Sequence, residues 1–185
     1  NLNKNEIITG LESVYGLCMY KSLISKSTYI FVSDIETLSI YQYRVLNFFP
    51  LKTQMVRQIK TSTTSEGCVA DDEYGILYFA QEDEDSGVYF IDAEPNDNKV
   101  ETLDRTRKYN GNVNGDTEGL ALLNHPKGKL LIASSQGSSN FTVYNVSQNK
   151  EFIGSFSINK SKRIDGVSRT DGIEIFYGKI NENFS

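Results

Sequence analysis

Carboxylates and a tyrosine recur beside glycine along this 185-residue sequence, at a spacing that could bring them together. A polar residue, a glycine and an apolar residue follow one another four times. The four steps are Tyr15-Gly16-Leu17, Glu66-Gly67-Cys68, Glu118-Gly119-Leu120 and Asp171-Gly172-Ile173. The glycines at 16, 67, 119 and 172 are therefore 51, 52 and 53 residues apart. A regular spacing of this kind indicates a structural repeat, in which equivalent side chains meet.

A second set of polar residues follows the glycines of the first three steps, each at the end of an apolar run. Asp34, Glu82 and Gln136 lie 18, 15 and 17 residues past Gly16, Gly67 and Gly119. The repeat therefore predicts one group of axial side chains, five of them carboxylates: Tyr15, Asp34, Glu66, Glu82, Glu118, Gln136 and Asp171. Clustered anions are costly unless a cation neutralises them.

The ligand types in this predicted group favour calcium. Carboxylate and amide oxygens without histidine or cysteine are hard ligands, which suit Ca²⁺ better than Zn²⁺. Asp116 lies two residues before Glu118, so both can share one face of an extended segment. A metal held there would attract a phosphate and activate water. The alternative interpretation is a solvated acidic rim with carboxylates in turns.

The elements that must position these side chains are short strands. Runs rich in Tyr, Phe, Val and Ile lie between Gly, Asn, Asp and Ser, and no long segment repeats at 3.6 residues. They occupy residues 29–33, 38–43, 75–80, 87–91, 129–135, 141–146 and 151–158. About four strands in a period near 52 residues predict an all-β fold, a β-propeller.

The predicted domain is a partial propeller over residues 1–185, with blades starting near 15, 66, 118 and 171 and the last one truncated. This is about three and a half four-stranded blades, and propellers close with four or more. We therefore expect a fragment of a longer chain, or half of an assembly, with the remaining blades as its partner.

Composition excludes several classes of function. The formal charge is −5, which argues against nucleic acid as a partner. No run of about 18 apolar residues occurs, so no membrane span is expected. The single histidine excludes mechanisms that need two imidazoles. Cys18 and Cys68 are interpreted as two packed thiols, although a bridge is possible and spacing does not decide.

Six segments of the sequence together resemble the β-propeller phytases, also called alkaline phytases. They are ESVYGLCMY (12–20), SEGCVADDEYGILYFAQEDE (65–84), DAEP (92–95), GDTEGLALL (115–123), LLIASSQGSSNFTVYN (130–145) and IDGVSRTDGIEI (164–175). The resemblance implies a six-bladed propeller and a phosphomonoesterase of the 3-phytase type. Such an enzyme hydrolyses phytate (myo-inositol hexakisphosphate), or another phosphate monoester, to lower inositol phosphates and phosphate, with calcium ions as cofactors and water activated by the metal.

The resemblance also assigns roles to individual residues. It implies that Glu66, Glu82, Asp116 and Glu118 are catalytic through calcium binding and water activation, and that Tyr15 contacts phosphate. It adds Gln136, Asp165 and the carbonyl of Gly166 as further calcium ligands. Asp34 and Asp171 are not carried over as principal ligands.

Family members are secreted or periplasmic, and that location is the expectation here. The chain begins at Asn1 without an apolar leader, so we expect that processing or truncation has removed any targeting signal.

One departure from the family pattern concerns phosphate binding. Ile35 occupies the loop position where the family has a phosphate-binding lysine, and other family cations fall outside these 185 residues. A chain of these residues alone is expected to be inactive. The alternatives are therefore a non-catalytic calcium-binding propeller module, a truncated inactive phytase-like fragment, or a lactonase-like or esterase-like propeller hydrolase.

Overall fold

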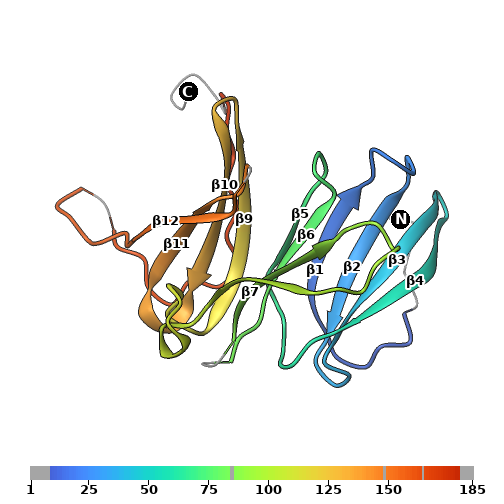
Figure 1. The fold of residues 1–185 in the computed structure, drawn as a ribbon, viewed down its shortest axis with the longest axis horizontal. Coiled ribbons are helices and arrows are strands. Elements are labelled where there is room, and N and C mark those ends of the chain that lie inside the picture. The colour runs from blue at the N-terminus through green and yellow to red at the C-terminus, as the bar shows by residue number, and fades with distance from the viewer. Residues whose placement is uncertain (1–8, 84–85, 148, 164, 180–185) are drawn as a thin grey trace.

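The computed structural model describes residues 9–83, 86–147, 149–163 and 165–179, and within them the chain is almost wholly β (Figure 1). The strands are β1 (Val14–Lys21), β2 (Thr28–Asp34), β3 (Ser39–Phe48), β4 (Leu51–Lys60), β5 (Cys68–Asp71), β6 (Ile76–Ala80), β7 (Gly87–Asp92), β8 (Glu101–Arg105), β9 (Thr117–His125), β10 (Gly128–Ser135), β11 (Asn140–Asn145) and β12 (Glu151–Phe156). Two single-turn 3-10 helices, η1 (Arg107–Tyr109) and η2 (Gln136–Ser138), accompany them. The described residues include no helix with the length and hydropathy needed to span a membrane.

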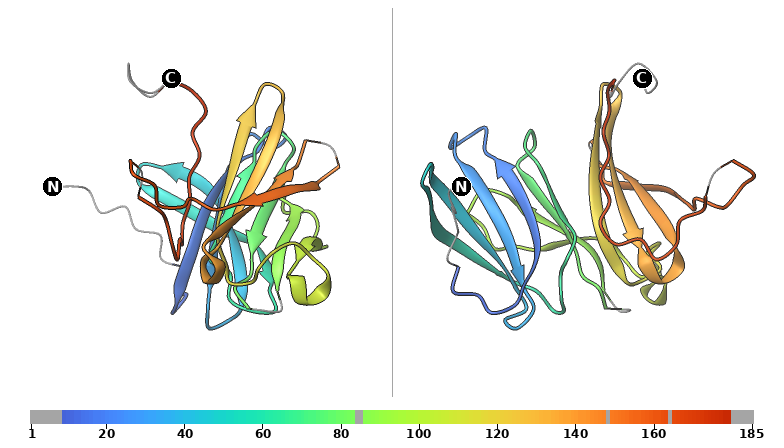
Figure 2. Two further views of the ribbon diagram at one scale, coloured as in Figure 1. Left: turned by 90° about the vertical axis from the view of Figure 1, so that its left-hand side faces the viewer. Right: turned by 180° about the vertical axis from the view of Figure 1, so that it is seen from behind.

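The strands form three antiparallel sheets of four, each following chain order: β1 to β4, β5 to β8 and β9 to β12. The sheets stand side by side, with β1, β5 and β9 as neighbouring inner strands (Figures 1 and 2). This arrangement confirms the all-β, blade-like fold. The inner strands begin at Val14, Cys68 and Thr117, close to the first three predicted blade starts. Residues 170–179, where the fourth start was expected, form no strand.

The middle strand β6 of the second sheet is buried because a blade packs on each of its faces. In β6, Leu77 and Phe79 are fully buried in the core between the first and second sheets. Tyr78 and Ala80 alternate with them and are fully buried in the core between the second and third sheets. Side chains of a strand point to opposite faces in turn, so an uninterrupted apolar run fits a strand covered on both sides. Six of the seven apolar runs detected in the sequence fall on middle strands, and the seventh, residues 151–158, falls on the outer strand β12.

The outer strands are far more exposed than the middle ones. β12 and β8 have no buried residue, and β4 has only two, whereas six of the seven residues of β2 are buried. Burial therefore falls from the blade middle to its outer edge, as expected for sheets that pack against one another around inner strands.

The prediction of two packed thiols is wrong. Cys18 in β1 and Cys68 in β5 form a disulfide, with their Cα atoms 5.8 Å apart. The bridge joins the inner strands of the first two sheets across a sequence separation of 50 residues. Spacing did not reveal it because the contact depends on how two separate blades pack.

Candidate functional site

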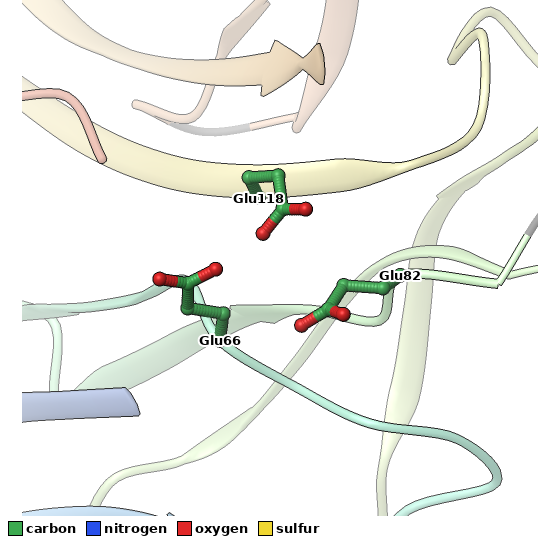
Figure 3. Close-up of side chains that lie close together, drawn as sticks. All are labelled: Glu66, Glu82 and Glu118. Atoms are coloured by element: carbon green, nitrogen blue, oxygen red, sulfur yellow. The ribbon is translucent and has the colours of Figure 1, made fainter. Parts of the chain in front are cut away.

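Three glutamates from different blade elements direct their carboxylates at one another (Figure 3). Glu66 lies just before β5, Glu82 follows the end of β6, and Glu118 is the second residue of β9. One carboxylate oxygen from each lies within 4.8 Å of the others. The structure thus brings together three of the predicted metal ligands, which we call the glutamate group.

Close packing of the inner strands explains why Glu66 and Glu118 meet. A Cβ atom added to Gly16 would lie 2.0 Å from the carbonyl oxygen of Glu66, and one added to Gly67 would lie 1.7 Å from that of Glu118. Only glycine permits this approach. Each glycine therefore lets the polar residue of the next repeat pack directly against its own inner strand.

The fourth repeat follows the same packing rule without forming a strand. A Cβ atom on Gly119 would lie 2.4 Å from the carbonyl oxygen of Asp171. The hydroxyl of Ser134 also donates to the carbonyl oxygen of Thr170 at 2.8 Å. The segment around Asp171 therefore lies against the third blade in the way that Glu118 lies against the second.

Burial and mutual repulsion make full ionisation of the glutamate group costly. Burial is the main cause that raises the pKa of Glu118 to about 9, followed by a hydrogen bond with Glu66 and the charges of Glu82, Glu66 and Asp116. Burial also raises the pKa of Glu82, and the charges of Glu66 and Asp116 add to this effect. A cation bound among these carboxylates would reverse that cost.

Two oxygens of the group have unused bonding capacity. Oε1 of Glu82 and Oε2 of Glu118 are buried and have no hydrogen-bond partner among the described residues. The other oxygen of Glu82 accepts a hydrogen bond from the Thr64 hydroxyl at 3.2 Å. Buried oxygens of this kind ordinarily have a partner. An oxygen-only set with unpartnered atoms fits a hard divalent cation.

Tyr15 lies beside the glutamate group and keeps its proton. Its pKa is raised well above the ordinary range, first by burial and then by the charges of Glu82, Glu66 and Glu118. The residue is nevertheless 41% exposed. The hydroxyl is therefore a neutral hydrogen-bond donor at the edge of an acidic site.

Asp116 and Gln136 lie close to the group, although neither belongs to it. The charge of Asp116 acts on Glu82 and Glu118, and its carbonyl oxygen accepts the backbone amide of Gln136 at 2.9 Å. The side-chain amide of Gln136 donates instead to Asp171. Gln136 thus meets another predicted axial residue rather than the three glutamates.

The structure does not bring the remaining predicted residues into the group. Asp165 and Gly166 lie exposed in the segment after β12, where Gly166 approaches the backbone of residues 158–160. The repeat predicted Asp34 as an axial residue, but its carboxylate bonds outside the glutamate group. Its carboxylate accepts hydrogen bonds from the amide of Ser13 and from the amide and hydroxyl of Thr37, which lowers its pKa. Asp34 therefore closes the β2–β3 turn.

Two hollows flank the glutamate group. One, of about 450 Å³, is lined by the inner strands and includes Tyr15, Glu66 and Glu118. The other, of about 550 Å³, includes Glu82 and Asp116 together with Arg107 and Lys108. Neither cation belongs to the polar-Gly repeat, so the sequence pattern did not predict them.

Comparison with known proteins agrees with this geometry. The sequence pattern of the phytase family matches residues 2–183. The 3-phytase of Bacillus subtilis (strain 168) is 34% identical over 173 residues, which cover 91% of this chain and 44% of the relative. The chain thus spans less than half the length of this curated relative.

Two solved structures share the fold at low sequence identity. One is a functionally unknown protein from Desulfotomaculum acetoxidans DSM 771, with a TM-score of 0.54 and 15% identity, covering 83% of this chain and 45% of that one. The other is a putative 6-phosphogluconolactonase from Bacteroides fragilis NCTC 9343, with a TM-score of 0.53 and 11% identity, covering 86% and 40%. They support the fold alone, whereas the family match and the Bacillus relative show that this chain belongs to the phytase family.

Proposed function

We propose that the protein is a calcium-dependent phosphomonoesterase that hydrolyses phytate. The observation that carries this proposal is the glutamate group, in which three carboxylates from different blade elements converge and two buried oxygens have no hydrogen-bond partner in the described part of the chain. Family membership supports phytate as the substrate class. The name of the Bacillus relative makes the 3-phosphate the first position to test.

The residues have distinct roles in this proposal. Glu66, Glu82 and Glu118 would hold calcium, with Asp116 adding negative charge beside them. Calcium bound there would offset the carboxylate charges, attract phosphate oxygens and lower the pKa of water. The protonated Tyr15 hydroxyl can donate a hydrogen bond to a phosphate oxygen. The packed glycines hold these groups in place before the substrate arrives, which lowers the cost of reorganisation.

An extracytoplasmic location fits the same proposal. Disulfides such as Cys18–Cys68 persist mainly in oxidising compartments. Calcium is also abundant enough outside cells to fill weak oxygen sites. We therefore propose a secreted or periplasmic protein.

The test is release of phosphate from phytate by these residues together with the remaining blades of the propeller, in calcium and after calcium removal by a chelator. We expect release only with calcium, and at least about a hundredfold loss in Glu82→Gln, because removing a preorganised charged group at a reaction centre costs this much. Glu151→Gln, which changes an exposed glutamate of β12, is the matched control.

Absence of calcium-dependent release by the unmodified protein would refute the enzyme proposal. If calcium still raised the melting temperature in that case, the result would favour a non-catalytic calcium-binding propeller. The half-buried Ile35, at a position where a phosphate-binding lysine was expected, is the feature that favours this second candidate.

A further inference from the structure

The disulfide between Cys18 and Cys68 lies directly beside one member of the glutamate group. Cys68 follows Glu66 by two residues, and Cys18 follows Gly16 by two. Gly16 is the glycine whose added Cβ would lie 2.0 Å from the Glu66 carbonyl oxygen. The two cysteines belong to β1 and β5, which are neighbouring strands of different sheets (Figure 1). The disulfide is therefore a covalent link between two sheets at the edge of the candidate metal site.

Other bonds between the first and second sheets lie farther from the glutamate group. The ladder hydrogen bonds run within each sheet, so they do not fix β5 relative to β1. At the far end of β1, the Lys21 amide donates to the Asp72 carboxylate at 2.8 Å, and the Tyr20 hydroxyl donates to Glu94 at 2.7 Å. Cys18 precedes both residues along β1, so the disulfide is the nearest of these bonds to the glutamate group.

The residue between Glu66 and Cys68 carries the effect of the disulfide to a second carboxylate. That residue is Gly67, and its added Cβ would lie 1.7 Å from the carbonyl oxygen of Glu118. Its own carbonyl oxygen accepts the Ala80 amide at 2.8 Å, a bond within the second sheet. The disulfide thus holds, from the side of β1, a segment that bears Glu66 and packs against Glu118.

The disulfide is open to small molecules. Both cysteines are half-buried, and they line the 450 Å³ hollow that also includes Glu66 and Glu118. A thiolate of a dithiol reductant that enters this hollow can attack one sulfur, which breaks the S–S bond and forms a mixed disulfide. The second thiol of the reductant then displaces the other cysteine. Two protonated cysteine thiols and one oxidised reductant result.

We propose that the Cys18–Cys68 disulfide positions Glu66 and makes calcium binding at the glutamate group dependent on oxidation. This inference rests on the calcium binding in the proposed function and extends it to regulation of the same site. In the disulfide form, the converging carboxylates are held together before calcium arrives, so binding does not have to order them. In the dithiol form, repulsion among the carboxylates moves the Glu66 segment away from the other two glutamates. A reducing compartment keeps the protein in this weakly binding form, and transfer to an oxidising one completes the site.

The direct test is calcium titration calorimetry on these residues together with the remaining blades of the propeller, before and after reduction by dithiothreitol. The temperature is one at which circular dichroism shows that both forms are folded. We expect reduction to raise the dissociation constant about tenfold, the result when Glu66 occupies its binding position about a tenth of the time. Cys18→Ala/Cys68→Ala should bind calcium as weakly as the reduced protein. Dithiothreitol should not weaken this variant further, which assigns the effect to this disulfide.

A matched variant separates positioning from stability. Ile59 is 2% exposed on the outer strand β4 and packs in the same core as the two cysteines. Ile59→Ala leaves a cavity there, so its melting temperature should fall as loss of the disulfide makes it fall. Its calcium affinity should nevertheless equal that of the unmodified protein, because the inner strands keep their covalent link.

Glu66→Gln tests whether the disulfide acts through Glu66. In this variant, reduction should change calcium affinity much less than in the unmodified protein, because two changes that act on one contact are not additive. Full additivity, equal affinity of the oxidised and reduced unmodified protein, an equal loss in Ile59→Ala, or no calcium binding by the oxidised protein would each overturn the inference. Calcium affinity that depends on oxidation, in a protein that releases no phosphate from phytate, would uphold the inference and refute the proposed enzyme.

Discussion

Replacing Glu118 with glutamine should change stability in opposite directions with and without calcium. Glu118 is 6% exposed, and its pKa is raised from 4.5 to about 9, mainly by burial. The folded form therefore holds this proton more tightly than the unfolded form. The resulting stability is fully present below pH 4.5 and is lost as the pH rises towards 9. Calcium-free protein should consequently become less stable across this range.

The size of the effect follows from the same values. Each pH unit between 4.5 and 8 lowers the free energy of unfolding by at most about 1.4 kcal/mol. The loss at pH 8 is therefore at most about 5 kcal/mol. Side-chain relaxation and screening by water reduce the penalty of a buried charge, so we expect roughly 1–3 kcal/mol. Glu118→Gln removes the charge, so without calcium at pH 8 its melting temperature should rise by roughly 2–12 °C.

With calcium, the unmodified protein should instead melt at a higher temperature than Glu118→Gln. At a calcium concentration of about a hundred times the dissociation constant, the unmodified protein gains about 2.7 kcal/mol. Glu118→Gln loses one charged ligand and should gain much less. The measurement is thermal unfolding from pH 5 to 9, with calcium and with a chelator, using Glu151→Gln as control. The same calcium-induced shift in Glu118→Gln and the unmodified protein would refute the assignment of Glu118 as a ligand.

Three further predictions concern packing and charge. Replacing Cys18 and Cys68 together by serine should lower the free energy of unfolding by about 4 kcal/mol, because a closed loop of 50 residues is released. Thermal unfolding measures this loss, and reducing the disulfide of the unmodified protein should reproduce it. Gly67→Ala should cost about 1–3 kcal/mol and weaken calcium stabilisation, since the added Cβ meets a carbonyl oxygen at 1.7 Å. Gly154→Ala, with no atom within 4 Å of its added Cβ, should do neither, and equal effects of the two would contradict the packing argument. Ile35→Lys should lower KM for phytate several-fold in steady-state kinetics, because a cation is added where the family has one; an unchanged KM would show that position 35 does not contact substrate.

Local pattern explains which parts of the fold were predictable. The apolar runs of β2 and β6 are buried on both faces, so their composition alone indicates strands. The polar-Gly repeat located Glu66 and Glu118 because the same close approach recurs between successive inner strands. Glu82 was found from its place after β6. Each of these signals depends on residue order, either within one short segment or at a regular spacing along the chain.

Asp34 shows the limit of the repeat as a guide. The repeat equates it with Glu82, yet Asp34 is the last residue of β2 and its carboxylate is used by the β2–β3 turn. Sequence spacing predicts the position of a residue within the repeat, whereas the neighbouring amides and hydroxyls decide where its side chain bonds.

The sequence by itself determined seven of the twelve described strands, the period of about 52 residues and the family resemblance, because these depend on residue order and on alternation within short segments. Only the tertiary structure decided the Cys18–Cys68 disulfide, the convergence of three of the predicted ligands and the place of Arg107 in the hollow that also includes Glu82. These are contacts between different blades or between a blade and a loop outside the repeat. Their geometry follows from how whole sheets pack, which no local pattern records.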